Sequence, residues 1–283
     1  MRKKLLLVLC CSVFMLGMSG AAWALNLYGN NATFGSPYVY VMNPVTMTVT
    51  DEITNLSGSN GRGVVVVGDT MYYTTATSPS VYSYTLSTHT DNGALFTVAG
   101  ASALSTMAYD GTNFWIGDYS GTNQAYLYTP TGTLIKTISL SNCSGHCDGL
   151  EYFVQNSQGR LISNRGDTVG PYDIYDTDGN LLTPSFINPT FASTGIAFDG
   201  TNFYVSEIYN GKIAEYDGTT GTFINETAIN GYNNRPLVED LSFDYVSVLP
   251  PPTPVPEPST MLLMGIALAG GAGFMRKRKV TKG

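Results

Sequence analysis

The residues best placed to do chemistry in this chain are one arginine and four carboxylates. They are Arg62, Asp148, Glu151, Glu239 and Asp240. If they converge, two or three carboxylates facing one arginine could bind a divalent cation or hold a sugar through paired hydrogen bonds. The simpler interpretation, which we favour, is that Arg62 neutralises Asp148 and Glu239 at a solvated surface.

Nucleophilic catalysis has little support in the sequence. The chain has two histidines, His89 and His146. His89 lies in a turn-like stretch and His146 lies between two cysteines, so neither belongs to a recognisable Ser-His-Asp or Cys-His arrangement. No glycine-rich phosphate loop appears at a strand-to-helix junction. We therefore expect a protein that is not an enzyme and has no required cofactor.

Cys143 and Cys147 form the one possible cysteine pair of the mature chain, because Cys10 and Cys11 lie in an N-terminal apolar run. In an oxidising compartment, two cysteines that close so short a loop indicate a disulfide. A soft-metal site completed by His146 is one alternative, although it lacks the fourth ligand of tetrahedral zinc sites. A pair of free thiols is the other.

A repeat of about 44 residues must position these side chains. Residues 108–116 (AYDGTNFWI) recur as residues 197–205 (AFDGTNFYV), a separation of 89 residues. Weaker copies start at Val64, Met107, Leu150, Ile196 and Leu241, at steps of 43, 43, 46 and 45 residues. Internal repeats of this length are typical of propellers and related arrays.

Each unit has the pattern of four short strands. In the clearest unit the expected strands cover residues 195–198, 202–208, 212–216 and 222–229. Asp-Gly, Asn-Gly and Thr-Gly turn signals separate them. A four-stranded unit of this length resembles a blade of the NHL, lactonase-like and related β-propellers.

Counting the unit starts predicts an all-β propeller of about five blades. Six blades remain possible if residues 25–34 and the C-terminal strands count separately. The first unit lacks its opening strand, whereas residues 240–248 supply a strand with no other partner. We therefore expect a ring closed by strands from both ends, which hides sheet edges that would otherwise recruit other chains.

Propeller ligands usually bind at the central channel, near the start of each innermost strand. Two residues before each unit start stand Arg62, Ser105, Asp148, Thr194 and Glu239, with Glu151 and Asp240 nearby. We expect these side chains to meet at one channel mouth. The lactonase-like resemblance implies a divalent cation there, so the alternative function is a metal-dependent lactonase-like hydrolase or a polysaccharide lyase.

A calcium loop is a further possibility at residues 176–180 (DTDGN). The residue two positions before Asp176 is Ile174 rather than a carboxylate, which departs from the calcium-loop pattern. The same residues fit an ordinary hairpin turn.

Charge excludes one class of partner. Residues 25–250 hold six basic and twenty acidic residues, a formal charge of −14. A body of that sign repels a phosphate backbone, so we do not expect nucleic-acid binding.

The tyrosine, asparagine, threonine and serine side chains of the outer strands would suit carbohydrate, although they suit any extracellular β protein.

Residues 1–24 have the three parts of a secretory signal peptide. A basic start is followed by an apolar stretch and by Ala22-Trp23-Ala24. Small residues at the two outer positions of such a triplet are those that signal peptidase recognises. We expect cleavage after Ala24 and a mature repeat domain over residues 25–249.

The C-terminal end has three parts of its own. Residues 250–258 hold six prolines and predict an extended linker. Residues 259–275 predict a single transmembrane helix near the short limit, and the basic tail 276–283 should stay cytoplasmic. A plain membrane anchor on a proline-rich stalk is one interpretation.

The motif Val255-Pro256-Glu257-Pro258-Ser259, followed by a short glycine-containing helix and a basic cluster, resembles the PEP-CTERM sorting signal over residues 255–282. By that resemblance, a membrane exosortase of a Gram-negative bacterium recognises the motif and removes the helix. The protein would cross the inner membrane, remain anchored for a time, and then reach the cell surface or extracellular matrix. We expect a structural or adhesive role there, associated with exopolysaccharide or biofilm.

Overall fold

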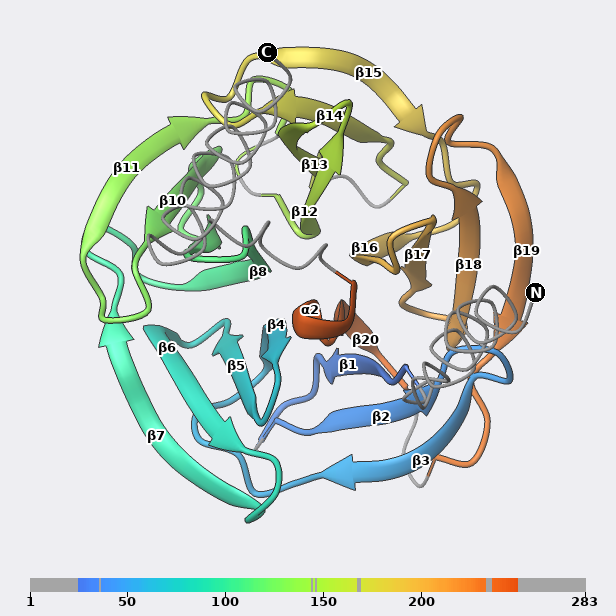
Figure 1. Cartoon of the computed structure of the whole chain (residues 1–283). Helices are drawn as coiled ribbons and strands as arrows, with labels where there is room; N and C mark the ends of the chain where they lie inside the picture. The colour runs from blue at the N-terminus through green and yellow to red at the C-terminus, as the bar shows by residue number, and fades with distance from the viewer. Residues whose placement is uncertain are drawn as a thin grey trace, which may run out of the picture. The chain divides into compact units, whose positions relative to one another are not determined.

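The computed structural model describes residues 25–35, 37–143, 145, 147–166, 169–232 and 236–248. These residues form twenty β-strands and the short helix α2 (Tyr245–Val248). Five four-stranded sheets stand side by side in a ring, with α2 over the middle (Figure 1). The prediction of a five-bladed propeller is confirmed.

Each of the first four blades is one continuous stretch of chain. The first holds β4 (Gly61–Val67), β5 (Thr70–Thr75), β6 (Ser78–Thr85) and β7 (Thr90–Thr97). The second holds β8 (Leu104–Tyr109), β9 (Phe114–Asp118), β10 (Gln124–Tyr128) and β11 (Leu134–Ser139). The third holds β12 (Leu150–Gln155), β13 (Gln158–Asn164), β14 (Tyr172–Asp176) and β15 (Leu181–Ile187). The fourth holds β16 (Ser193–Phe198), β17 (Asn202–Glu207), β18 (Lys212–Asp217) and β19 (Phe223–Ala228).

The fifth blade joins the two ends of the body. Its inner strand is β20 (Val238–Phe243), and the outer three are β1 (Leu27–Asn31), β2 (Val39–Asn43) and β3 (Thr48–Ile53). β20 pairs antiparallel with β1, with Leu27 opposite Phe243. The expectation of a ring closed by strands from both ends is therefore confirmed.

The repeated Asp-Gly-Thr-Asn segments are the turns between the first and second strands of two blades. Asp110 Oδ1 accepts hydrogen bonds from the backbone N–H groups of Thr112 and Asn113, at 2.9 and 2.7 Å. Asp199 repeats this arrangement in the fourth blade. Gly111 and Gly200 have φ values of +94° and +95°, which glycine adopts without strain.

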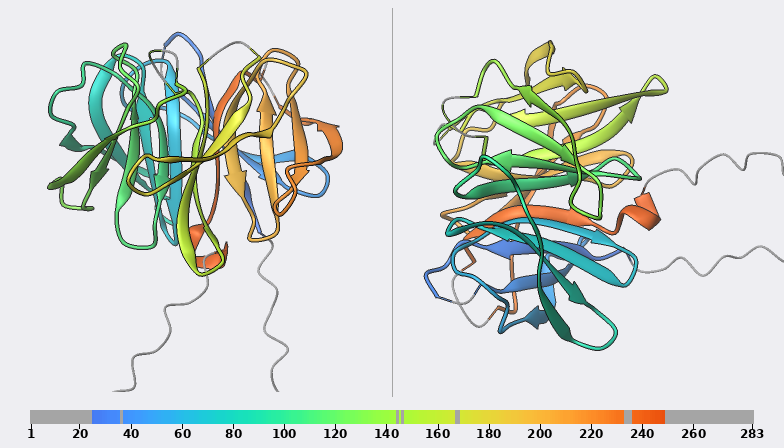
Figure 2. Two further views of the ribbon diagram at one scale, coloured as in Figure 1. Left: turned by 90° about the horizontal axis from the view of Figure 1, so that it is seen from above. Right: turned by 90° about the vertical axis from the view of Figure 1, so that its left-hand side faces the viewer.

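The hydrophobic core lies between the blades. The buried apolar residues form five clusters, and each cluster combines side chains of two neighbouring blades. Trp115 and Tyr175, for example, come from the second and third blades. The inner strands run along the axis of the ring, the outermost strands run around its rim (Figure 1), and α2 lies at one end (Figure 2).

The carboxyl group of Asp240 joins the inner strands of the ring. Its Oδ2 atom accepts hydrogen bonds from the Thr106 hydroxyl at 3.0 Å and from the backbone N–H groups of Val64 and Met107 at 3.2 Å. The Thr106 hydroxyl oxygen accepts from the Leu150 N–H at 3.0 Å. We call Asp240 and Thr106 the channel plug, because together they connect β20, β4, β8 and β12 on the ring axis.

Polar side chains of β20 and of the residue that follows it also cover the free edge of β4. They alternate along the chain and accept hydrogen bonds from alternate N–H groups of β4 and of the residue after it. The pairs are Asp240 with Val64, Ser242 with Val66 and Asp244 with Gly68, at 3.2, 3.1 and 2.9 Å. An inner edge strand has no sheet partner on the channel side, so these side chains satisfy groups that would otherwise be costly to bury.

A substitution tests the channel plug. Asp240→Ala removes the acceptor of three buried donors, each of which costs about 1–3 kcal/mol when left unpaired. We expect the free energy of unfolding, measured by urea denaturation, to fall by several kcal/mol. Asp178→Ala removes an exposed carboxylate paired with Lys136 and should change stability by less than about 1 kcal/mol. Equal effects of the two substitutions would contradict the role given to Asp240.

A candidate binding pocket at the channel mouth

A pocket of about 380 Å³ opens at the end of the ring where the inner strands begin. Its wall includes residues from the starts of β4, β16 and β20 and from the segment just before β12. The lining residues are Ala32, Phe34, Asn60, Arg62, Tyr119, Asp148, Gly166, Ala192, Ser193, Thr194, Ile208, Tyr209, Leu237 and Glu239. α2 follows the end of β20, so it covers the opposite mouth.

Arg62 and Glu239 form a largely buried ion pair in this pocket. The guanidinium also lies over the ring of Tyr119, 4.4 Å from the ring centroid, and donates to the Tyr119 hydroxyl at 3.2 Å. Burial raises the pKa of Tyr119, so this hydroxyl is neutral at physiological pH. One basic side chain therefore fixes a carboxylate and an aromatic ring in place.

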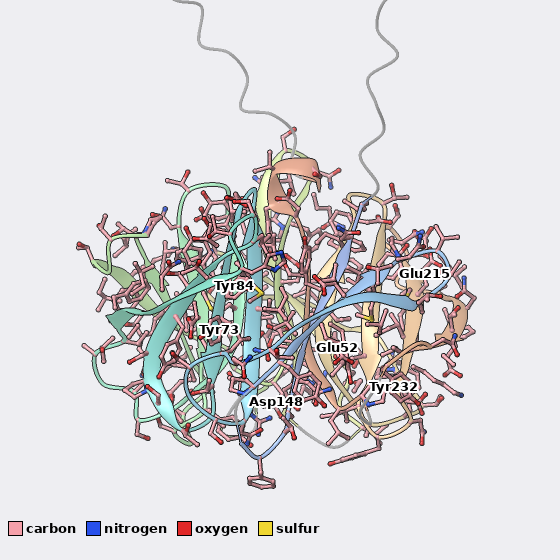
Figure 3. The ribbon with its side chains drawn as sticks, turned by 90° about the horizontal axis from the view of Figure 1, so that it is seen from below. Glu52, Tyr73, Tyr84, Asp148, Glu215 and Tyr232 are labelled. Atoms are coloured by element: carbon pink, nitrogen blue, oxygen red, sulfur yellow. A yellow bond between two sulfur atoms is a disulfide. The ribbon has the colours of Figure 1, made fainter. Side chains whose placement is uncertain are left out.

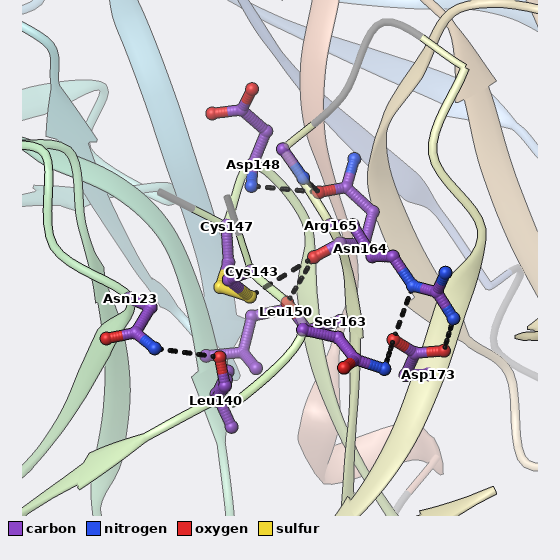
Figure 4. Close-up of a disulfide and its surroundings, with 12 residues drawn as sticks. Asn123, Leu140, Cys143, Cys147, Asp148, Leu150, Ser163, Asn164, Arg165 and Asp173 are labelled. Carbon is purple, nitrogen blue, oxygen red and sulfur yellow. Dashed lines mark hydrogen bonds and ion pairs between the residues drawn. A yellow bond between two sulfur atoms is a disulfide. The ribbon is translucent and has the colours of Figure 1, made fainter. Parts of the chain in front are cut away.

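Asp148 supplies the second carboxylate of the pocket. Its backbone N–H donates to Asn164 Oδ1 at 3.0 Å. The side chain lies toward the end of the ring opposite α2 (Figure 3) and points away from the neighbouring disulfide (Figure 4). Of the side chains expected at the mouth, Arg62, Asp148, Thr194 and Glu239 line the pocket, whereas Ser105 is buried and is not among the lining residues.

Three aromatic side chains at the mouth were not expected from the sequence. Tyr119, Tyr209 and Phe34 each lie in the loop that follows the second strand of a blade. The second strand runs antiparallel to the first, so its end lies at the mouth where the inner strand starts. Phe34 is 96% exposed and Tyr209 is 56% exposed. The sequence does contain a signal for this aromatic rim, because an aromatic residue stands at nearly the same place in three repeats.

Glu151 and Asp240 do not line this pocket. Asp240 belongs to the channel plug below it, and burial raises its pKa well above the ordinary range. Glu151 is buried nearer the opposite mouth, where it accepts hydrogen bonds from the Tyr245 hydroxyl of α2 and from the Tyr152 N–H. The alternation of side chains along a strand separates these two residues from Asp148 and Glu239.

Cys143 and Cys147 form a disulfide, with 5.5 Å between their Cα atoms (Figure 4). The expected disulfide is therefore present. The two alternatives for this pair, a soft-metal site and free thiols, are wrong. His146 lies outside the described residues. The bond closes a short loop directly before Asp148 and so restricts the backbone that carries this carboxylate.

The described part of the chain contains no cluster of side chains that could form a metal centre. Among those residues, no group of three or more His, Cys, Asp or Glu side chains could hold a metal ion. Asp176 accepts hydrogen bonds from the backbone N–H groups of Asp178 and Asn180, both at 2.9 Å. Residues 176–180 thus form the hairpin turn between β14 and β15.

These features define a class of protein: a five-bladed β-propeller with a polar, aromatic-rimmed pocket at one channel mouth. One chain in the crystal structure of a nidogen/laminin complex is similar, with a TM-score of 0.53, 11% identity, and coverage of 77% of this chain and 98% of that chain. Myxococcus xanthus glutaminyl cyclase gives a TM-score of 0.45 at 14% identity, covering 66% and 71%. At 11% identity the likeness to the first of these concerns the fold alone, and no curated protein sequence matches the chain.

Residues 254–279 match the family model of the PEP-CTERM protein-sorting motif. The chain therefore carries a PEP-CTERM motif after its propeller, as the sequence predicted. The motif implies export and exosortase-mediated sorting to the surface of a Gram-negative bacterium. The expected signal peptide (1–24), linker (250–258), helix (259–275) and tail (276–283) lie outside the described residues. The part that is described contains no helix long and apolar enough to cross a membrane.

The buried carboxyl group of Glu151 predicts a pH-dependent stability. Burial raises its pKa from 4.5 to about 8. Between these values the folded state binds more protons than the unfolded state, so the free energy of unfolding falls as pH rises, by at most about 1.4 kcal/mol per pH unit. Urea denaturation from pH 5 to 8 should show this decline in the native protein and a flatter profile in Glu151→Gln. An unchanged slope in that variant would assign the decline to other groups.

Proposed function

We propose that this protein binds glycan at the cell surface or in the extracellular polysaccharide matrix, where it acts as an adhesive or structural component. The observation that carries the proposal is the pocket at the channel mouth. Exposed aromatic rings suit the flat apolar faces of sugars, and carboxylate and hydroxyl groups suit their hydroxyls. Phe34 and Tyr209 supply the rings, and Asp148, Thr194 and Glu239 supply polar groups.

The sorting motif supports the same place of action. An exported protein meets the cell's own exopolysaccharide, so binding to this partner needs no further transport step. We propose that signal peptidase removes residues 1–24 and that exosortase then releases the body from a transient inner-membrane anchor. The calculated charge of the body and its uncharged polar surface residues are compatible with a soluble matrix component.

Substitution of the two exposed rings tests glycan binding. Phe34→Ala with Tyr209→Ala removes both stacking faces and should weaken binding to the cell's purified exopolysaccharide at least about tenfold. Surface plasmon resonance measures the affinity. Phe223→Ala, which removes a similarly exposed ring from the outer strand β19, is the matched control and should bind as the native protein does. Equal binding by both variants would refute this use of the pocket.

Substitution of Glu257 tests the sorting step. Glu257→Gln removes the charge at the centre of the Pro-Glu-Pro motif, and we expect the uncut form to accumulate in the membrane fraction. Immunoblotting of membrane and medium fractions from the producing bacterium measures this. Thr253→Ala, which lies outside the matched residues 254–279, should be released normally. Normal release of the Glu257 variant would contradict recognition of this motif.

A further inference from the structure

Lining residues from all five blades surround the pocket at the channel mouth. The blades, taken from the first to the fifth, contribute Arg62, Tyr119, Asp148, Thr194 and Glu239 among others. A groove that crosses a surface is lined from two sides, whereas this pocket is lined from every side of the ring axis. The described residues therefore form a closed wall around it.

The inner strands close the pocket from below. Thr194 and Glu239 are followed in the chain by Gly195 and Asp240, and a Cβ atom on Gly195 would lie 2.5 Å from the Cα atom of Asp240. Real Cβ atoms essentially never come within 3.0 Å of such a neighbour, so the fourth and fifth blades touch at this level. The channel plug of Asp240 and Thr106 connects the other inner strands. The described part of the channel is therefore closed beneath the pocket.

The side walls of the pocket are held in place by contacts of their own. Arg62 forms an ion pair with Glu239 and lies over the ring of Tyr119. The Thr194 hydroxyl lies 3.2 Å from the Ser206 hydroxyl of β17. Walls fixed in this way do not part to admit the middle of a long polymer, so a ligand must enter and leave through the mouth.

The two exposed aromatic residues lie on one side of the mouth. Phe34 follows β1 in the fifth blade and Tyr209 follows β17 in the fourth, and these two blades are neighbours in the ring (Figure 1). Exposed aromatic rings suit the apolar face of a sugar. A sugar unit that leaves the pocket on this side meets one of these rings, so the rim marks the direction in which the rest of a bound chain runs.

We infer that the pocket binds the end of a saccharide chain and not an internal segment. The inference rests on the proposed glycan-binding function and names the part of the glycan that is bound. The terminal unit occupies the pocket, whose volume of about 380 Å³ is near the lower end of the range of about 300–1,000 Å³ for ligand pockets. The next unit stacks on Phe34 or Tyr209. The chain ends and branch ends of a polysaccharide therefore set how many copies of the protein it can hold.

Isothermal titration calorimetry of the full chain in mild detergent tests the inference through the stoichiometry of binding. The probes are the cell's purified exopolysaccharide and the same material after partial acid hydrolysis, with the chain ends of each counted by a reducing-end assay. We expect the number of protein molecules bound per unit mass of polysaccharide to rise in proportion to the number of chain ends. An unchanged or lower number would overturn the inference and leave glycan binding intact. If neither probe binds, the proposed function fails as well.

A variant that fills the pocket separates it from the aromatic rim. Ala192 is a lining residue, and Ala192→Phe places a ring in the space that the terminal unit needs. We expect this variant to bind both probes at least about tenfold more weakly than the native protein. Ala94→Phe, the same change at an exposed position of the outer strand β7, is the matched control and should bind as the native protein does.

Native affinity in the Ala192 variant would place the ligand across the rim and overturn the inference. Circular dichroism checks that both variants are folded. The stoichiometry of the native protein tests the inference independently of either variant.

Discussion

The ring depends on one buried carboxyl group. Asp240 accepts hydrogen bonds from two inner strands besides its own, and Thr106 extends the connection to a third. Each inner strand has a free edge on the channel side, and a buried backbone N–H without an acceptor is costly. Placing a short acidic side chain on the axis satisfies these groups in the small space that five closely approaching blades leave.

The channel plug of Asp240 and Thr106 separates two different ends of the ring. Below the channel plug, the buried carboxyl group of Glu151 accepts a hydrogen bond from the buried Tyr245 hydroxyl of α2. Above it, Arg62, Asp148 and Glu239 border an open pocket with aromatic loops around it. The proposed binding site therefore has a floor of fixed geometry, because the residues beneath it are held by several strands at once.

The fold could be predicted from the sequence because its signals are periodic. Unit starts such as Val64 and Leu241 recur at a nearly constant step, and each marks a residue on an inner strand. Both Asp110 and Asp199 belong to turns whose hydrogen bonds are local, so short segments suffice to identify them. The missing first strand and the surplus last strand indicated how the ring closes.

The site could be predicted only in part. Arg62 and Glu239 stand at the same position of their repeats, so the sequence placed both at one channel mouth. Adjacent residues of a strand point to opposite sides, and Asp240 therefore lies in the channel plug instead of the pocket. Phe34 and Tyr209 were missed because loops differ in length between repeats, and their position at the mouth follows from antiparallel pairing rather than from spacing. The energetic role of Asp240 was hidden because its partners are backbone groups of distant strands.

The pairing of β1 with β20 has a consequence for the order of events during export. The fifth blade is assembled from the first and last strands of the body, so the circle stays open until nearly the whole domain has left the translocation channel. Any chain that stops before residue 238 leaves the edge of β1 unpaired and available for aggregation. The sorting motif begins at residue 254, soon after this closing strand, so only a polypeptide that already contains every blade can present it.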